Sequence, residues 1–162
     1  MRDAVGAIKK VRSPTAEATE ALGSQLAASR APRAEGLIVV YLTGDLGAGK
    51  TTLARGFLHA LGVTGAIRSP TYTLLETYET PDVTVVHLDL YRLRDTAELE
   101  PLGLRDLALP GYVWLVEWPE RGAGGMPGAD VHIALTVGAG AHHIELRGLS
   151  GPGQEWVQRM NA

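Results

Sequence analysis

The feature that most constrains this chain is a glycine-rich loop between an apolar run and a helical pattern. It fits the phosphate-loop pattern G-x-x-x-x-G-K-[ST] at every fixed position, and its residues are Gly44-Asp45-Leu46-Gly47-Ala48-Gly49-Lys50-Thr51. Glycine lets such a backbone curl until successive N–H groups point inward and form an anion-binding nest. Lys50 would place a mobile charge on the outer phosphates, and the Thr51 hydroxyl would bind the Mg²⁺ that accompanies ATP. The loop therefore predicts a nucleoside-triphosphate site.

The residues on either side of the loop decide whether the match is an accident in a chain with 20 glycines. Residues 37–42, LIVVYL, form the continuous apolar run expected of a strand buried on both faces. Residues 51–61 place Leu53 and Phe57 on one side of a helix, which Gly62 ends. Strand, loop and helix follow in the order that the motif requires. This order argues against the alternative, a glycine-rich turn beside a core helix.

The remaining patterns predict one α/β domain over residues 1–162, with a central mixed parallel and antiparallel sheet flanked by helices. A helix is expected after Thr15, where apolar residues recur every fourth position. Further strands are expected at residues 74–78, 83–88, 112–116, 131–137 and 142–146. The first two of these strands should form one hairpin, and the last two should form another. We expect residues 1–12 to be a loose or edge-bound start, and residues 150–162 to be a tail with a short helix at 154–160.

Composition excludes several classes of protein. A net charge of −3 gives no basic surplus for a nucleic-acid surface, so any contact with RNA should run through a partner. The chain has no cysteine, which excludes disulfides and thiolate metal sites and fits a reducing cytoplasm. No apolar run is long enough to span a membrane. We therefore expect an ordinary cytoplasmic globular protein.

Two acids are candidates for the metal side of the nucleotide site. Asp89 and Glu117 each end an apolar strand pattern, so each should lie at the carboxyl edge of an open α/β sheet, where ligands bind. A phosphate loop needs such an acid because the Mg²⁺ on the outer phosphates must be held from a second side. His87 shares a strand face with Asp89. The alternative is that both acids merely end a strand at the surface.

Missing residues narrow the class of nucleotide protein. Asn161 is the only asparagine, and no glutamine lies between Gln25 and Gln154. A guanine-specific switch protein needs an Asn-Lys-x-Asp motif and commonly a glutamine that orients water. The sequence therefore gives no support for that kind of GTP specificity. His142 and His143 are neighbours on one strand and should face opposite ways, so they do not form one metal site easily.

Four motifs in sequence order resemble those of one bacterial family. They are residues 44–52, 69–74 (SPTYTL), 87–93 (HLDLYRL) and 117–121 (EWPER). In order and spacing they resemble the TsaE (formerly YjeE) ATPases. That resemblance implies the ATPase component of the machinery that makes threonylcarbamoyladenosine beside the tRNA anticodon, working with TsaD and TsaB. It implies contact with tRNA only through those partners.

The resemblance also implies roles for single residues. The phosphates and Mg²⁺ would be held by Gly47, Gly49, Lys50, Thr51 and Thr52, with Glu117 as a magnesium ligand and Asp89 as the second essential acid. Residues 69–74 would be a switch-like loop near the γ-phosphate. The complete predicted site comprises a nucleotide set (Gly44, Asp45, Gly47, Ala48, Gly49, Lys50, Thr51, Thr52), a metal set (Thr51, Glu117, Asp89) and a catalytic set (Asp89, Glu117, Lys50, Thr71).

Two other functions stay open at this point. A small-molecule kinase also uses a G-K-T-T loop in a short chain, and it would need an arginine-rich lid, for which Arg92, Arg94 and Arg105 are candidates. A switch that binds ATP without hydrolysing it would use the nucleotide only to order residues 69–74 for a partner. The fate of the γ-phosphate separates these alternatives from an ATPase.

Overall fold

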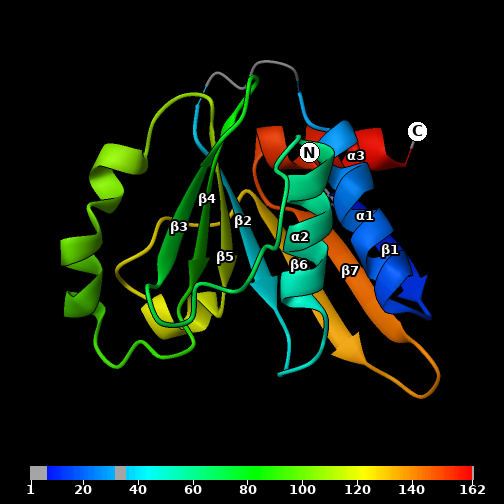
Figure 1. Ribbon diagram of the computed structural model, residues 1–162. Helices are drawn as coiled ribbons and strands as arrows, with labels where there is room; N and C mark the ends of the chain where they lie inside the picture. Colours follow the sequence, from blue (N-terminus) through cyan, green and yellow to red (C-terminus); the bar gives the residue numbers. More distant parts are fainter. Residues whose placement is uncertain (1–6, 32–35, 162) are drawn as a thin grey trace, which may run out of the picture.

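A seven-stranded mixed sheet forms the centre of the structure, in the order β1-β7-β6-β2-β5-β4-β3 (Figure 1). The computed structural model describes residues 7–31 and 36–161. The strands are β1 Ile8–Ser13, β2 Ile38–Thr43, β3 Leu75–Glu79, β4 Thr84–Asp89, β5 Tyr112–Glu117, β6 Val131–Val137 and β7 His142–Gly148. The α-helices are α1 Ala16–Ala28, α2 Lys50–Ala60 and α3 Gly151–Met160, and the 3-10 segments are η1 Thr96–Leu102, η2 Leu104–Leu107 and η3 Pro119–Gly122.

The sheet has a parallel centre and antiparallel edges. Strands β6, β2, β5 and β4 run parallel to one another, whereas β3 pairs antiparallel with β4, and β7 pairs antiparallel with both β6 and β1. This arrangement confirms the predicted α/β fold with a mixed sheet and the two predicted hairpins. No helix in the described ranges is long and apolar enough to cross a membrane.

Each face of the sheet has its own hydrophobic core, which explains the continuous apolar runs of the central strands. One face carries Val40 and Leu115 and packs against the three α-helices. The other face carries Val39 and Trp114 and is covered by leucines between residues 90 and 107. Figure 1 shows α1 and α2 side by side over one face, with η1 and η2 beyond the β3 edge. The site edge of the sheet is therefore supported from both sides.

Both ends of the described chain are more ordered than the sequence indicates. Residues 8–13, of which 8–12 belong to the segment expected to be loose or edge-bound, form the edge strand β1, whose register pairs Ile8 with Arg147 and Ser13 with His142. Residues 1–6 of that segment lie outside the described residues. The tail forms α3 from Gly151, capped by Ser150. Trp156 of α3 is buried and donates from Nε1 to the carbonyl oxygen of Leu26 at 2.9 Å.

The segment after β4 begins with a helix cap. Asp95 and Glu98 form a capping box at the start of η1. The segment is a 3-10 helix that contains Pro101 and ends at Gly103, which has a φ of 68°. Proline removes one backbone donor without ending so short a segment, because a 3-10 turn has few hydrogen bonds to lose.

Helices α1 and α2 approach each other at two glycines. A Cβ atom at Gly56 would overlap the carbonyl oxygen of Glu20, and one at Gly23 would overlap the carbonyl oxygen of Leu53. The missing side chains let the two backbones come into contact. This contact fixes the position of α2, and therefore of the glycine-rich loop that precedes it.

We expect Gly56→Ala to lower the free energy of unfolding by about 1–3 kcal/mol because of the backbone overlap, although alanine is the better helix former by about 1 kcal/mol. Urea denaturation followed by circular dichroism measures the change. Gly128→Ala is the matched control, since a Cβ there meets no atom within 4 Å. Equal stability of the Gly56→Ala variant and the unmodified protein would contradict this account of the helix contact.

Candidate functional site

The candidate site lies where β2, β5 and β4 end, at the carboxyl edge of the parallel strands. Asp89 and Glu117 are partners in the β4–β5 register, and Glu117 is also the partner of Leu42 in β2. The glycine-rich loop leaves β2 at the same level. A cavity of about 270 Å³ lies between them, lined by Leu46, Gly47, Gly49, Lys50, Thr51, Thr52, Ser69, Thr71, Asp89, Tyr91, Glu117 and Trp118. The structure thus brings most of the predicted site residues together.

The loop has the backbone conformation that only glycine adopts without strain. Gly44, Gly47 and Gly49 have φ angles of 147°, 81° and 105°. Gly49 is also the N-cap of α2, so the free N–H groups of the first helical turn point toward the concave side of the loop. The side chain of Ala48 is buried in the core, and that of Asp45 is exposed. Neither residue lines the cavity, so these two members of the predicted nucleotide set could contribute only backbone groups.

Lys50 is held back against the loop itself. Its side chain is buried, and Nζ donates to the carbonyl oxygens of Gly44 and Asp45, the latter at 3.0 Å. Nζ also lies 4.2 Å from the centre of the Trp118 ring. Burial lowers the pKa of Lys50, while the neighbouring carboxylates, of which Glu117 has the largest effect, act in the opposite direction. The ammonium group lies at the cavity, where an anion would replace the carbonyl oxygens.

Thr51 and Glu117 are in direct contact. Thr51 Oγ1 donates to Glu117 Oε1 at 2.9 Å and to Oε2 at 3.1 Å. The Glu117 carboxylate is buried and accepts a further hydrogen bond from His87 Nε2. Within the described ranges no group of three or more His, Cys, Asp or Glu side chains forms a metal site by itself. A hydroxyl beside one carboxylate suits Mg²⁺, which takes few protein ligands when phosphate oxygens supply the rest.

Asp89 anchors the hydroxyl-rich loop that precedes β3. Its Oδ2 accepts hydrogen bonds from Ser69 Oγ and from Thr71 Oγ1, the second at 3.2 Å. Its Oδ1 accepts from the backbone N–H of Tyr91 at 3.0 Å. Residues 69–74 are therefore tied to the same edge of the sheet as the glycine-rich loop. Leu74 ends this segment with a φ of 68°, a conformation rarely adopted by residues other than glycine.

Two aromatic residues at the cavity, Tyr91 and Trp118, are not among the predicted site residues. Trp118 follows Glu117 with a φ of 58°, which takes its ring out of the sheet and over Lys50. The Tyr91 ring lies 5.0 Å from the Trp118 ring. The only sequence signal was their position inside the motifs 87–93 and 117–121, because strand periodicity says nothing about residues that follow a strand.

A second, smaller hollow lies on the other side of the loop. Its volume is about 180 Å³, and Gly47, Gly49 and Thr52 line both hollows. The other wall comes from the end of β1, the start of α1 and the two residues between them, together with His142. The glycine-rich loop therefore separates an acidic cavity from a hollow in which no described lining residue carries a carboxylate.

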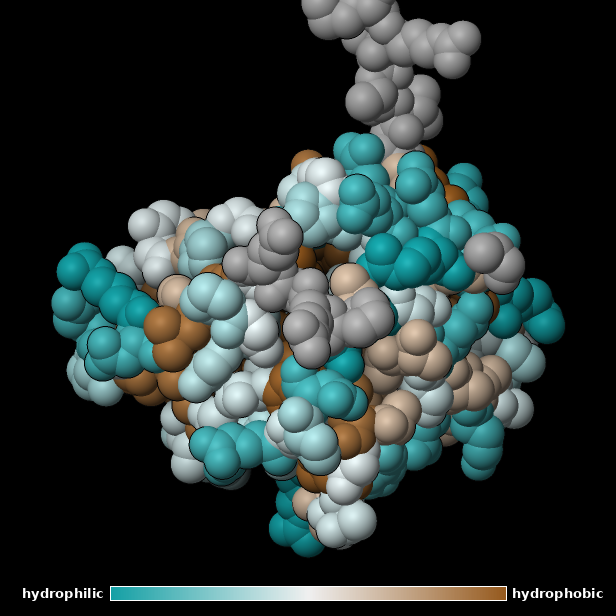
Figure 2. All heavy atoms as spheres, turned by 90° about the horizontal axis from the view of Figure 1, so that it is seen from above, coloured by the Kyte–Doolittle hydropathy of each residue, from teal (hydrophilic) through white to brown (hydrophobic). Residues whose placement is uncertain are grey.

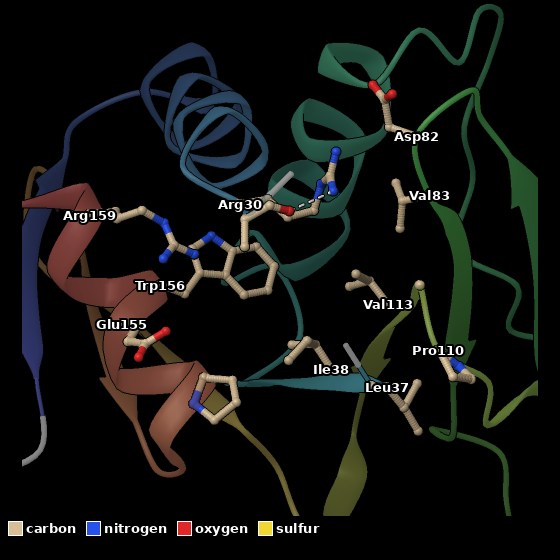
Figure 3. Close-up of a pocket in the computed structure, with 14 residues that line it drawn as sticks. Arg30, Leu37, Ile38, Asp82, Val83, Pro110, Val113, Glu155, Trp156 and Arg159 are labelled. Atoms are coloured by element: carbon tan, nitrogen blue, oxygen red, sulfur yellow. Dashed lines mark hydrogen bonds between the residues drawn. The ribbon is translucent and has the colours of Figure 1, made fainter. Parts of the chain in front are cut away.

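A larger hollow lies at the opposite end of the sheet. It encloses about 550 Å³ at the amino ends of β2 and β5, with Trp156, Ile38 and Val113 on its walls and Arg30 and Arg159 beside them (Figure 3). Figure 2 looks onto this end of the molecule, where hydrophobic residues lie in recesses between hydrophilic ones. Ligands of open α/β sheets bind at the carboxyl ends of the strands. Size alone therefore does not identify the functional site here.

We expect Asp89→Ala to loosen residues 69–74, because each hydrogen bond to a charged carboxylate contributes about 1.5–3 kcal/mol. Amide hydrogen exchange of a peptide that covers this loop should become about tenfold faster or more, with α2 unchanged. Asp82→Ala is the control, since Asp82 is exposed in the turn between β3 and β4. Unchanged exchange of the loop in the Asp89→Ala variant would contradict the anchoring role.

Comparison with known proteins agrees with this geometry. The family model described as "Threonylcarbamoyl adenosine biosynthesis protein TsaE" matches residues 12–144. The tRNA threonylcarbamoyladenosine biosynthesis protein TsaE of Haemophilus influenzae is 48% identical over 112 residues, which cover 69% of this chain and 71% of that protein. The protein of the same name from Bacillus subtilis is 40% identical over 109 residues, covering 67% of this chain and 65% of that protein.

A solved structure shows the same fold. The crystal structure of YdiB from Bacillus subtilis superposes with a TM-score of 0.77 at 26% identity, and the superposition covers 96% of this chain and 95% of that chain. The superposition therefore extends over a larger part of the chain than the family model, which matches residues 12–144. Family model, relatives and solved structure agree, and the chain belongs to the TsaE family.

Proposed function

We propose that this chain binds ATP with Mg²⁺ and hydrolyses it as a subunit of the cytoplasmic machinery that makes threonylcarbamoyladenosine in tRNA. The observation that carries the proposal is the convergence of Lys50, Thr51, Asp89 and Glu117 on one cavity beside the glycine-rich loop. The names of the family and of its relatives support the assignment to tRNA modification. TsaD and TsaB are the partners that the family resemblance implies, and tRNA would be reached only through them.

The two hollows beside the loop support one orientation of the nucleotide. In phosphate-loop proteins the lysine contacts the outer phosphates and the next hydroxyl contacts the metal. The cavity that contains Lys50 and Thr51 would therefore hold the γ-phosphate. The ribose and base would leave the loop on the side of Thr52, toward the hollow between β1 and α1.

Thr51 and Glu117 would hold the magnesium ion. Their oxygens already face each other at the start of α2, and both are the hard donors that Mg²⁺ prefers. Asp89, the neighbour of Glu117 in the sheet, is the second carboxylate on this side. The chemistry that Mg²⁺ held by these residues would supply is neutralisation of the negative charge on the outer phosphates.

Asp89 and the loop of residues 69–74 would bind and orient the water that attacks the γ-phosphate. A carboxylate at this edge can accept a hydrogen bond from that water and orient it. Thr71 contacts Asp89 and lines the same cavity, so the loop would respond to the phosphate group. Since no glutamine lies between Gln25 and Gln154 to orient water, we expect slow turnover by the chain alone and a change of rate with TsaD and TsaB.

We expect Lys50→Ala to reduce ATP turnover about a hundredfold or more, the usual effect of removing one preorganised donor from a developing oxyanion. Phosphate release is measured with Mg²⁺ and ATP, first with the chain alone and then with TsaD and TsaB. Lys10→Ala is the matched control, because Lys10 is exposed on β1. A Lys50→Ala variant that folds and turns ATP over at the original rate would refute the site assignment.

The same assay separates the two alternatives. A small-molecule kinase would transfer the γ-phosphate to an added metabolite rather than to water. A switch that does not hydrolyse ATP would bind it and release no phosphate, with or without the partner proteins. Arg92, a candidate for a kinase lid, has its guanidinium 4.2 Å from the centre of the Tyr72 ring at the protein surface, so no observation favours the kinase.

A further inference from the structure

One buried histidine contacts a residue of the site without lining the cavity itself. His87 is the only histidine in the described ranges whose side chain is completely buried. It lies on β4, opposite Leu115 in the β5 register. It does not line the phosphate cavity, which is the cavity of about 270 Å³ that contains Lys50 and Thr51. A buried imidazole is costly unless its N–H group is hydrogen-bonded. The partner of this ring is therefore a strong clue to its role.

That partner is the carboxylate of Glu117. His87 Nε2 lies 2.6 Å from Glu117 Oε2, and because a carboxylate only accepts hydrogen bonds, Nε2 carries the proton. Nδ1 is buried without a partner among the described residues. The contact with Glu117 is therefore the one polar interaction of this ring among the described residues, and it makes the ring a donor to one oxygen of Glu117.

The other donor to Glu117 is Thr51, whose hydrogen bond to the carboxylate would break when the hydroxyl binds the metal ion. Thr51 Oγ1 contacts both carboxylate oxygens, at 2.9 Å and 3.1 Å, but its hydroxyl belongs to the proposed ligand set and would turn to the ion. His87 sits on β4, which is flanked on both sides by other strands, and it does not line the cavity. Of the two donors, His87 is therefore the one that keeps its bond to Glu117 when the nucleotide is bound.

We propose that His87 is a positioning residue: by holding Glu117 Oε2, it fixes the rotation of the carboxylate and turns Oε1 toward Thr51 and the phosphate cavity. This inference rests on the proposed binding of ATP with Mg²⁺. Partners behind a metal ligand commonly change metal affinity about 10–100-fold. Losing His87 should therefore reduce the amount by which Mg²⁺ raises nucleotide affinity. It should leave the affinity measured without Mg²⁺ unchanged.

The test compares nucleotide affinity with Mg²⁺ and with EDTA, using a fluorescent ATP analogue that resists hydrolysis. In His87→Leu the gain due to Mg²⁺ should fall about tenfold, while affinity in EDTA stays the same. In His87→Gln the amide nitrogen takes the place of Nε2 and should restore most of the gain. His87→Asn keeps an amide but is too short to reach Glu117, so it should behave like His87→Leu and replaces that variant if it does not fold.

A double variant shows whether His87 acts through Glu117. Adding His87→Leu to Glu117→Gln should lower the gain no further, because the two changes would remove one shared interaction.

A merely structural role would instead lower the melting temperature and weaken binding equally with and without Mg²⁺, which would overturn the inference. An unchanged gain in both His87→Leu and His87→Asn would overturn the positioning role alone. If Mg²⁺ gave the unmodified protein no gain at all, the proposed function would fail together with this inference.

Discussion

The parallel register of β2, β5 and β4 determines where the functional side chains lie. Leu42 pairs with Glu117, and Glu117 pairs with Asp89, so the loop that follows β2 begins beside both acids. A slip of one residue would turn an acid to the other face of the sheet. Separate hydrophobic cores on the two faces prevent that slip, because each alternate residue of the central strands already has its own packing partners.

The groups that would meet the nucleotide are satisfied by one another in this structure. Lys50 donates to carbonyl oxygens of the loop, Thr51 donates to Glu117, and Asp89 accepts from Ser69 and Thr71. Each such bond to a charged group is worth about 1.5–3 kcal/mol. Binding a triphosphate would exchange these contacts for new ones of the same kind, so the site can be preorganised without leaving buried charges unpaired. If the nucleotide replaced the contacts of Ser69 and Thr71 with Asp89, the conformation of residues 69–74 would depend on whether the nucleotide is bound.

Local patterns allowed the loop and both acids to be predicted from the sequence, since each is a motif or an apolar run that ends in a carboxylate. The sequence left residues 1–12 as loose or edge-bound, because Lys9, Lys10 and Arg12 obscure the apolar alternation of β1. Pairing with β7 is what stabilises this strand. The contact between His87 and Glu117 joins residues 30 positions apart. It depends on strand order and register, which no local pattern contains.

A crystal structure with Mg²⁺ and a non-hydrolysable ATP analogue tests the account most directly. We predict the phosphates against the loop amides at the start of α2, with Lys50 Nζ moved from the carbonyl oxygen of Asp45 to the outer phosphates and Thr51 on the ion. The result that would contradict the account is a nucleotide in the hollow beside Trp156 and Arg30, with Lys50 still bonded to the carbonyl oxygens of its own loop.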